Sequence, residues 1–246
     1  MSSSPRDRLI VALDFDSLDS ALDLVHRLSD FGCMFKVGSR LFTASGPEAV
    51  KKVAALGAGI FLDLKFHDIP HTVAGAVKAA LRLPGIRLTN VHALGGAAMM
   101  AAAAEARSSQ KEDSSSAAKL IAVTVLTSMD APALRRVGVS GTLSESVLKL
   151  SKLAKESGLD GVVASALESR RIRNAFGKDF IILNPGVRPG EPGSTAKRPK
   201  DDQVRVATPA EAIRAGADYI VVGRPITAAT DPRAAAEAIL REMESA

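Results

Sequence analysis

Short apolar segments rich in β-branched residues alternate along the whole chain with longer segments of helical periodicity, and this alternation constrains the fold most. The strand candidates are residues 9–14, 34–37, 60–65, 88–92, 120–126, 161–164, 180–184 and 219–222. Helical patterns with start or stop signals include residues 17–28, 47–56, 69–81, 144–157 and 232–243. Strands separated by helices are typical of parallel sheets with crossover connections.

Eight strand candidates favour a closed barrel over an open sheet. A barrel unit of one strand and one helix takes about 30 residues, so eight units fill a chain of this length. We therefore expect an α/β fold, namely a single-domain eight-stranded β/α (TIM) barrel over residues 1–246. The alternative is an open doubly wound sheet of the flavodoxin or Rossmann kind. It is weakened because no Gly-x-Gly-x-x-Gly follows the first strand candidate.

The N-terminal residues carry no targeting signal. Residues 1–8 are polar and charged, and we expect them to be flexible. The apolar run that follows is broken at Asp14, which makes it too short for a signal-peptide core or a membrane span. Cys33 is the only cysteine, so no intrachain disulfide can form. We expect a cytoplasmic protein that does not associate with membranes.

The net charge of +5 suits an anionic partner, which is nucleic acid, anionic lipid or a small phosphorylated substrate. Proteins that bind nucleic acid interleave basic residues with aromatic side chains on which bases stack. This chain has no tryptophan and one tyrosine. We therefore expect no nucleic-acid partner and favour a small phosphorylated substrate.

Two segments fit no regular element. Residues 108–116 are polar and of low complexity, and they predict a solvated connection without a chemical role. Residues 185–203 combine prolines, glycines and charges of both signs, and they are long for a strand-to-helix connection. Long loops of this composition are either disordered or functional, and we interpret 185–203 as an active-site lid.

Polar residues stand at the ends of most strand candidates, where a β/α barrel carries its active site. They are Asp14, Lys36, Asp63, Lys65, His92, Thr127 and the pair Gly223 and Arg224. Any one of them has a structural explanation, because strand ends are where a chain returns to water. The convergence of so many at one rim favours a functional site.

The segment around Lys65 is the most informative part of this rim. Asp63 and Lys65 are two residues apart on a strand, so both side chains point to the same face. The structural alternative is a salt bridge that closes the barrel, but charges inside a barrel are costly, which favours function. Asp68 precedes Ile69 and Pro70 at a helix start, so spacing alone predicts a helix N-cap.

The eighth strand candidate runs into Gly223 and Arg224, and this combination suits a phosphate group. Glycine allows close approach of backbone N–H groups, and arginine binds phosphate through two nitrogens. The loops after strands seven and eight are the usual phosphate site of such barrels, which would bring Arg188 beside Arg224. We find no metal-ligand spacing, nucleophile elbow or P-loop in the sequence. We interpret His92, His67 and His71 as packing residues.

Several stretches of the sequence together resemble the bacterial type of the orotidine 5'-phosphate decarboxylase family. They are LIVALDF (9–15), FKVG (35–38), DLKFHDIPHT (63–72), NVHALGG (90–96), VTVLTSM (123–129), NPGVRPG (184–190), DDQ (201–203) and YIVVGRPIT (219–227). They span nearly the whole chain in order. DLKFHDIPHT is highly specific, whereas the final glycine and arginine are shared with many phosphate-binding barrels.

The resemblance implies a homodimer with shared active sites and a role for each matching residue. Lys36, Asp63 and Lys65 would act in one subunit, while Asp68, Ile69 and Thr72 reach into the partner's site. Asp14 and Lys36 would hold the ribose. Thr127 would contact the pyrimidine, with Pro185 also binding substrate. The phosphate would be held by Arg188, Gln203, Gly223 and Arg224.

The implied reaction is the decarboxylation of orotidine 5'-phosphate to UMP in pyrimidine biosynthesis, without cofactor or metal. Lys65 would stabilise the C6 carbanion electrostatically and then protonate it. One alternative is a Mg²⁺-dependent sugar-phosphate decarboxylase or lyase of the same barrel group. Another is a non-catalytic barrel that binds nucleotide phosphate.

Overall fold

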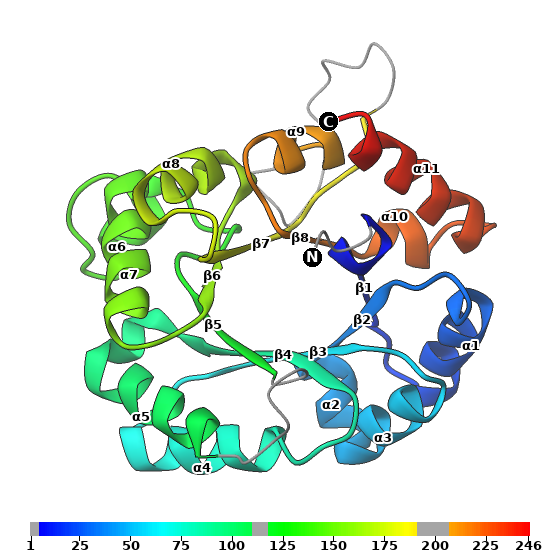
Figure 1. The fold of residues 1–246 in the computed structure, drawn as a ribbon, viewed down its shortest axis with the longest axis horizontal. Coiled ribbons are helices and arrows are strands. Elements are labelled where there is room, and N and C mark those ends of the chain that lie inside the picture. Colours follow the sequence, from blue (N-terminus) through cyan, green and yellow to red (C-terminus); the bar gives the residue numbers. More distant parts are fainter. Residues whose placement is uncertain (1–4, 110–117, 191–206) are drawn as a thin grey trace.

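The computed structural model of the chain describes residues 5–109, 118–190 and 207–246. Its sheet is a closed barrel of parallel strands that follow one another in chain order, as seen down the barrel in Figure 1. The strands are β1 (Leu9–Ala12), β2 (Met34–Gly38), β3 (Ile60–Phe66), β4 (Ile86–His92), β5 (Lys119–Val123), β6 (Gly161–Val163), β7 (Ile181–Pro185) and β8 (Tyr219–Val222). The predicted eight-stranded β/α barrel is confirmed.

The longer helices surround the barrel on the outside, and the short η1 near the N-terminus lies within this ring at one end of the barrel (Figure 1). The helices are η1 (Pro5–Arg8), α1 (Leu18–Leu28), α2 (Ser39–Ser45), α3 (Pro47–Ala55), α4 (Pro70–Ala80), η2 (Ala93–Gly95), α5 (Gly96–Ser108), α6 (Ala131–Arg136), α7 (Leu143–Glu156), α8 (Ala166–Phe176), α9 (Pro209–Arg214), α10 (Arg224–Thr227) and α11 (Pro232–Glu244). Side chains fix several starts: Ser17 accepts the N–H of Ser20, and Thr142 forms a capping box with Glu145. Such caps stabilise a helix by about 1 kcal/mol each.

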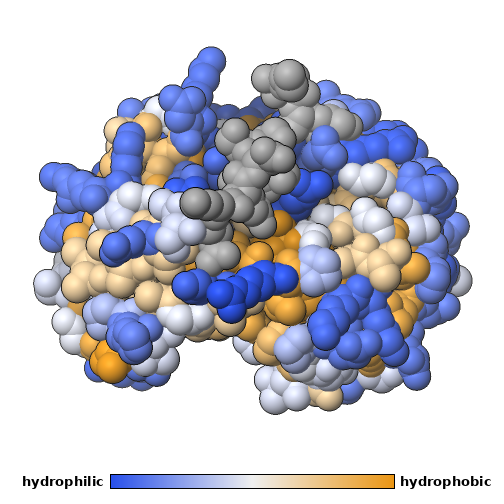
Figure 2. Space-filling model, turned by 60° about the horizontal axis from the view of Figure 1, so that its bottom comes forward, coloured by the Kyte–Doolittle hydropathy of each residue, from blue (hydrophilic) through white to orange (hydrophobic). Residues whose placement is uncertain are grey.

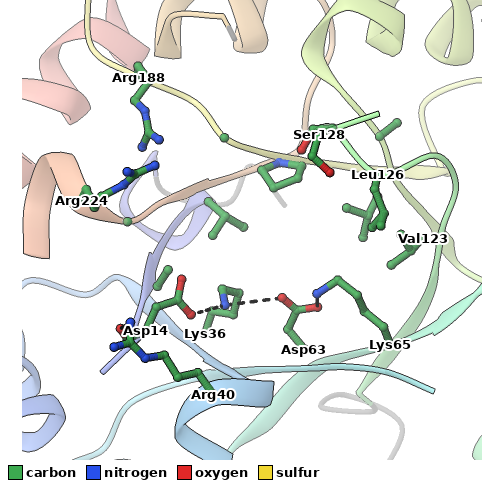
Figure 3. A pocket seen from close by; sticks show the side chains of 18 of the residues that line it. Asp14, Lys36, Arg40, Asp63, Lys65, Val123, Leu126, Ser128, Arg188 and Arg224 are labelled. Carbon is green, nitrogen blue, oxygen red and sulfur yellow. Dashed lines mark hydrogen bonds and ion pairs between the residues drawn. The ribbon is translucent and has the colours of Figure 1, made fainter. Parts of the chain in front are cut away.

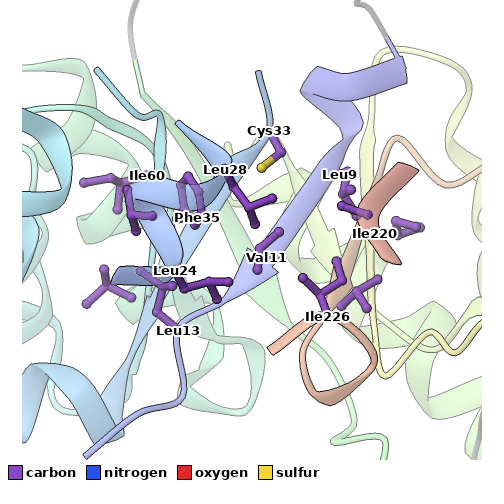
Figure 4. Packing of buried hydrophobic residues seen from close by; sticks show 14 of the residues in the cluster. Leu9, Val11, Leu13, Leu24, Leu28, Cys33, Phe35, Ile60, Ile220 and Ile226 are labelled. Carbon is purple, nitrogen blue, oxygen red and sulfur yellow. The ribbon is translucent and has the colours of Figure 1, made fainter. Parts of the chain in front are cut away.

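The strand alternation divides the core into two layers. Ile10 and Ala12 of β1 point into the barrel, where they join inward side chains of the other strands such as Phe61 and Val221. The intervening residues point outward. Figure 4 shows outward-facing Val11 among Leu28 and other side chains that the helices contribute. Each fully buried aliphatic side chain stabilises the fold by about 1.5–3 kcal/mol, so the alternation fixes the strand register.

Two predicted strands run clearly past the observed ones, over 9–14, where β1 ends at Ala12, and over 120–126. The apolar run over 120–126 predicted a strand to Leu126, but β5 ends at Val123. Its neighbour β6 has three residues, and the N–H of Thr124 makes a last bond to the carbonyl of Val163, at 3.1 Å. Beyond Thr124 the chain leaves the sheet. The next three residues, 125–127, line the mouth of the barrel instead.

The remaining predictions concern the N-terminal residues, the polar insert and the loop after β7. Residues 5–8 form η1, and Arg8 donates to the carbonyls of Ala217 and Asp218. The N–H of Arg188 donates to the carbonyl of Ala207, at 3.0 Å, so residues 188 and 207 are held together. Residues 110–116 of the polar insert and 191–203 of the predicted lid lie outside the described residues. No helix in the described parts is long and apolar enough to cross a membrane.

Candidate active site

A cavity of about 560 Å³ opens at the carboxyl ends of the strands, inside the barrel mouth (Figure 3). Predicted site residues from six strands or the loops after them line it. They are Asp14, Lys36, Asp63, Lys65, Thr127, Pro185, Arg188, Gly223 and Arg224. Three other predicted residues, Asp68, Ile69 and Thr72, do not line it. Gln203 lies outside the described residues.

Four charged side chains of alternating sign form a continuous chain along the cavity (Figure 3). The ammonium Nζ of Lys36 lies 2.8 Å from Asp14 Oδ1 and 3.5 Å from Asp63 Oδ2. The other oxygen of Asp63 lies 2.7 Å from Nζ of Lys65. Asp63 and Lys65 therefore meet on one face, as their two-residue spacing predicts.

Burial makes these charges depend on one another. Burial alone disfavours the charged form of Asp63, but Lys36 and Lys65, with hydrogen bonds from Lys65 and Asn90, outweigh it and lower the pKa of Asp63. Burial likewise disfavours the Lys36 ammonium, but Asp63 and Asp14 outweigh it and raise the pKa of Lys36. Removing one partner from a fully buried ion pair costs about 3–5 kcal/mol, so Lys36 and Asp63 stabilise each other strongly. The side chain of Lys65 is 37% exposed, so the other charges depend less on it.

The backbone of Lys65 departs from the strand. Its φ of 51° is the only left-handed value for a non-glycine residue in the described chain. Asn90 of β4, which the sequence did not single out, accepts the N–H of Lys65 and donates to Asp63. The sequence did offer one signal, which is an asparagine in the middle of a strand that is buried at the neighbouring positions 88, 89 and 91. Such a residue must find hydrogen-bond partners when it is buried.

Arg40 is a second residue that the sequence did not single out. It lies in the first turn of α2, lines the cavity and pairs with Asp16. Its Nη1 donates to the backbone carbonyl of Asp14, at 3.0 Å. Arg40 therefore fixes the backbone that carries the Asp14 carboxylate. Its distance in sequence from Asp14 hides this contact from any local pattern.

Two arginines stand at the other end of the cavity. Arg188 follows β7 and Arg224 follows β8, and these strands are neighbours in the sheet. Figure 3 shows both guanidinium groups on one side of the cavity, away from Lys65. The placement of Arg188 beside Arg224 is what the barrel order predicted. The two cationic ends of the cavity suit a substrate with two separate anionic groups.

The residues after Phe66 form the start of α4. Spacing alone predicted Asp68 as the helix N-cap, and this is wrong. The N-cap is Ile69 with Pro70 as the first helical residue, and the Asp68 carboxylate accepts the N–H of Ile69, at 2.6 Å. Asp68 and Thr72 are exposed, and Ile69 is 66% exposed.

A histidine pair lies beside the cavity. The rings of His67 and His92 stack with centroids 5.2 Å apart, and Nδ1 of His92 accepts the N–H of Leu94, at 3.3 Å. Burial, then the neighbouring His67 and Lys65, lowers the pKa of His92 to about 4. His92 is therefore neutral at physiological pH and acts as a hydrogen-bond acceptor.

The free energy of unfolding is expected to fall as the pH drops from about 6.5 towards 4, because unfolded His92 takes up a proton in this range while folded His92 does not. The loss attributable to His92 between pH 7.5 and 5 is about 2 kcal/mol. Urea unfolding of the native chain and of His92→Gln at both pH values measures it. Carboxylate titrations are common to both chains, so an equal pH dependence in the two would contradict the assignment.

The geometry matches known proteins over nearly the full chain. Residues 7–239 match the model of the Orotidine 5'-phosphate decarboxylase / HUMPS family. Orotidine 5'-phosphate decarboxylase from Moorella thermoacetica is 54% identical, covering 97% of this chain and 93% of the relative, and that from Nitrosococcus oceani is 50% identical, covering 98% and 99%. The crystal structure of the enzyme from Lactobacillus acidophilus matches with a TM-score of 0.83 and 40% identity, covering 96% of this chain and 99% of that one.

The described residues contain no group of three or more His, Cys, Asp or Glu side chains that could hold a metal ion. What the cavity offers instead is a buried chain of lysines and aspartates with two arginines opposite. The family match covers every strand of the barrel that carries these residues. The chain belongs to the orotidine 5'-phosphate decarboxylase / HUMPS family.

Proposed function

We propose that this chain decarboxylates orotidine 5'-phosphate to UMP, without cofactor or metal, in the cavity at the barrel mouth. The observation that carries the proposal is the Lys65 ammonium, held by Asp63 at one end of a cavity whose other end presents two arginines. The substrate is a nucleotide with a carboxylate on its ring and a phosphate on its ribose. Its reacting group and its phosphate need separate cationic contacts, and the cavity supplies both.

The chemical difficulty is a carbanion. The bond between C6 and the carboxylate breaks, its electron pair stays on C6, and CO₂ leaves. No adjacent carbonyl delocalises this pair, and most decarboxylases use a cofactor for that purpose. Here the Lys65 ammonium stabilises the developing charge and then transfers a proton from Nζ to C6. The resulting amine regains a proton from solvent, so the catalyst is restored.

The rest of the cavity positions the substrate. Arg188, Arg224 and the backbone at Gly223 hold the phosphate, with Gln203 as a further phosphate ligand. A Cβ added at Gly223 would come no closer than 3.7 Å to Ala12, so the packing of the protein leaves this position free for a ligand. These contacts are far from C6 and supply binding energy that orients the reacting carbon.

The other substrate groups lie between the two cationic ends. Asp14 and Lys36 hold the ribose hydroxyls, and their contact of 2.8 Å fixes both side chains before substrate binds. Thr127 and Pro185 contact the pyrimidine. The apolar side chains of Val123, Val163 and Val221 form the adjoining cavity wall. An apolar wall strengthens the interaction of Lys65 with the reacting carbon, because it lowers the local dielectric.

We further propose that the active unit is a homodimer in which Asp68, Ile69 and Thr72 enter the partner's site. Their exposure and their absence from this subunit's own cavity support this. Exposed large apolar side chains follow three consecutive strands around the mouth, at Ile69 (66%), Leu94 (47%) and Leu126 (40%). Such a grouping next to a site is typical of a protein interface.

The surface beside this loop is also weakly polar. The first turns of helix α5 expose Ala97, Ala98 and Ala101, while Glu105 and Ser108 are exposed at its far end. Helix α5 packs on α4, which begins at the same loop. Figure 2 brings the side with these helices forward and shows hydrophobic residues gathered in the middle of that face. A weakly polar surface beside the site suits the interface of a two-fold dimer.

The test is the loss of ultraviolet absorbance as orotidine 5'-phosphate becomes UMP, with pure protein, before and after treatment with EDTA. We expect turnover that EDTA does not change. Turnover that EDTA abolishes, or Mg²⁺-dependent release of CO₂ from a keto-sugar phosphate, would favour the sugar-phosphate alternative. Tight UMP binding without turnover would favour a non-catalytic sensor.

Replacing Gly38 with alanine is expected to lower kcat/KM by about tenfold while the protein stays folded. The new Cβ would lie 2.6 Å from Nζ of Lys36 and 3.4 Å from Asp14 Oδ1. The end of a lysine side chain moves more easily than the backbone, so the clash displaces the ammonium. Steady-state kinetics and a thermal unfolding curve measure the two effects.

A double-mutant cycle shows whether Gly38→Ala lowers kcat/KM by displacing Lys36 or by a general disturbance of the structure. If Gly38→Ala acts by displacing Lys36, it has little further effect in a Lys36→Ala background. The same fold-change in both backgrounds would contradict the explanation.

A further inference from the structure

Asn90 is buried in β4 and connects the two residues at the reacting end of the cavity. Its side chain is 0% exposed, and it is not among the residues that line the cavity. Its Oδ1 accepts the backbone N–H of Lys65, at 2.8 Å. Its Nδ2 donates to Asp63 Oδ1, at 2.7 Å, and this oxygen also accepts from Nζ of Lys65, at 2.7 Å. One amide therefore contacts both the backbone of Lys65 and the partner of its ammonium.

The position of Asn90 coincides with a break in the ladder between β3 and β4. Leu62 pairs with Thr89 and the next pair is Phe66 with Val91, so residues 63–65 of β3 face Asn90 alone. The backbone of one residue, Asn90, cannot supply regular ladder hydrogen bonds to all three residues 63–65. The Asn90 side chain replaces the missing backbone partner of Lys65.

The break is also where the backbone is strained. Lys65 adopts a φ of 51°, a conformation that a lysine adopts rarely and that surrounding contacts must impose. The hydrogen bond from its N–H to Asn90 is such a contact. Because Lys65 leaves the strand with this turn, the path of its side chain depends on Asn90.

We propose that Asn90 is a positioning residue for the reaction. Asn90 holds Lys65 in its left-handed conformation, and it fixes the Asp63 carboxylate, which in turn orients the Lys65 ammonium. Asn90 acts through these two residues and touches no substrate atom. The inference rests on the proposed decarboxylation and adds a residue to it. An amide is required at this position, because it presents one acceptor to the backbone and one donor to the carboxylate.

Three variants test the assignment. Asn90→Ala removes both contacts, and Asn90→Asp keeps the shape and the acceptor but replaces the donor with a second carboxylate beside Asp63. Thr89→Val is the matched control, because Thr89 is also 0% exposed on β4 and its Oγ1 donates to the carbonyl of Leu62, at 3.2 Å. It removes one buried hydrogen bond between the same two strands without touching the pair.

We expect Asn90→Ala to lower kcat for orotidine 5'-phosphate about 100-fold, with KM changed less than about threefold, because misplaced catalytic groups lose rate more than binding. Thr89→Val should keep kcat within about threefold of the native chain. Asn90→Asp should show an extra ionisation in its pH profile. Two adjacent carboxylates share one proton, and the protonated form can donate to Asp63 as the amide does.

The pH profile of Asn90→Asp reports this local contact because few ionisable groups of the described residues lie near position 90. Asp63 and Lys65 lie on β3, and Lys36 contacts Asp63. His92 lies farther along β4, and the residue paired with position 90 on β5 is the apolar Ile121. The kcat of Asn90→Asp relative to the native chain should therefore rise as the pH falls. The ratio for Asn90→Ala should stay flat over the same range.

The outcomes separate this inference from the function on which it rests. An inactive native chain would refute the proposed function and this assignment with it. An active native chain with Asn90→Ala within about threefold of it in kcat would refute the assignment alone. Failure of both Asn90 variants to fold, while Thr89→Val folds, would show a requirement of the fold and would also overturn it.

Discussion

Lys65→Ala is expected to lower kcat for orotidine 5'-phosphate by about 10⁴-fold or more. The substitution removes a proton donor, worth about 10²–10⁴-fold, and a preorganised charge at the developing carbanion, worth about 10²–10³-fold. Product binding should change much less, since Arg188 and Arg224 remain. Asp63 keeps its contacts with Lys36 and Asn90, so the cavity stays assembled. Steady-state kinetics at saturating substrate, together with a UMP titration, measure both effects.

A lysine away from the cavity is the control. Lys152 on α7 is largely exposed and pairs with Glu156, so Lys152→Ala should leave kcat unchanged. Thermal unfolding of both variants shows whether the chain remains folded. A Lys65→Ala protein with kcat within tenfold of the native chain would contradict the proposed proton donor.

Asp68→Ala is expected to lower kcat by about 10³-fold, although Asp68 does not line the cavity of its own subunit. Within one subunit its side chain is exposed, and among the described residues it accepts the adjacent N–H of Ile69. The loss of such a contact has a small effect on stability and none on a distant reaction. A large loss of kcat with unchanged unfolding temperature is therefore the signature of a role in the partner's site. Kinetics and calorimetry on the same preparation measure the two quantities.

The matched control is Asp179→Ala. Asp179 is also exposed but precedes β7, at the opposite end of the barrel from the cavity. It should change kcat less than twofold, as expected for a surface substitution away from a site. Equal kinetics for both aspartate variants would refute the role of Asp68.

The sequence predicted the barrel because its strongest signals are repetitive. Alternation of Ile10 and Val11, or of Phe61 and Leu62, separates the barrel interior from the helix-facing layer, and every strand repeats it. The same two-residue period predicted that Asp63 and Lys65 lie on one face, although in the structure they meet through a left-handed turn at Lys65 and not along a regular strand. Chain order then placed the ends of β7 and β8 side by side, which brought Arg188 and Arg224 together.

What the sequence did not predict depends on contacts across the sheet. Nothing in the local pattern around Lys65 predicts its left-handed backbone, because Asn90 on the next strand imposes it. The N-cap prediction for Asp68 failed by one residue, since Pro70 occupies the first helical position and leaves Ile69 as the cap. The strand over 120–126 was too long because β6, which must pair with it, has three residues.

Mixing Lys65→Ala subunits with Asp68→Ala subunits tests the shared active site most directly. Each heterodimer would contain one site with both residues intact and one site that lacks both. Random exchange makes half of the dimers heterodimers, so an equal mixture should recover about a quarter of native kcat. The two variants alone should remain almost inactive. Verified heterodimers that show no recovery would contradict a site built from Lys65 of one subunit and Asp68 of the other.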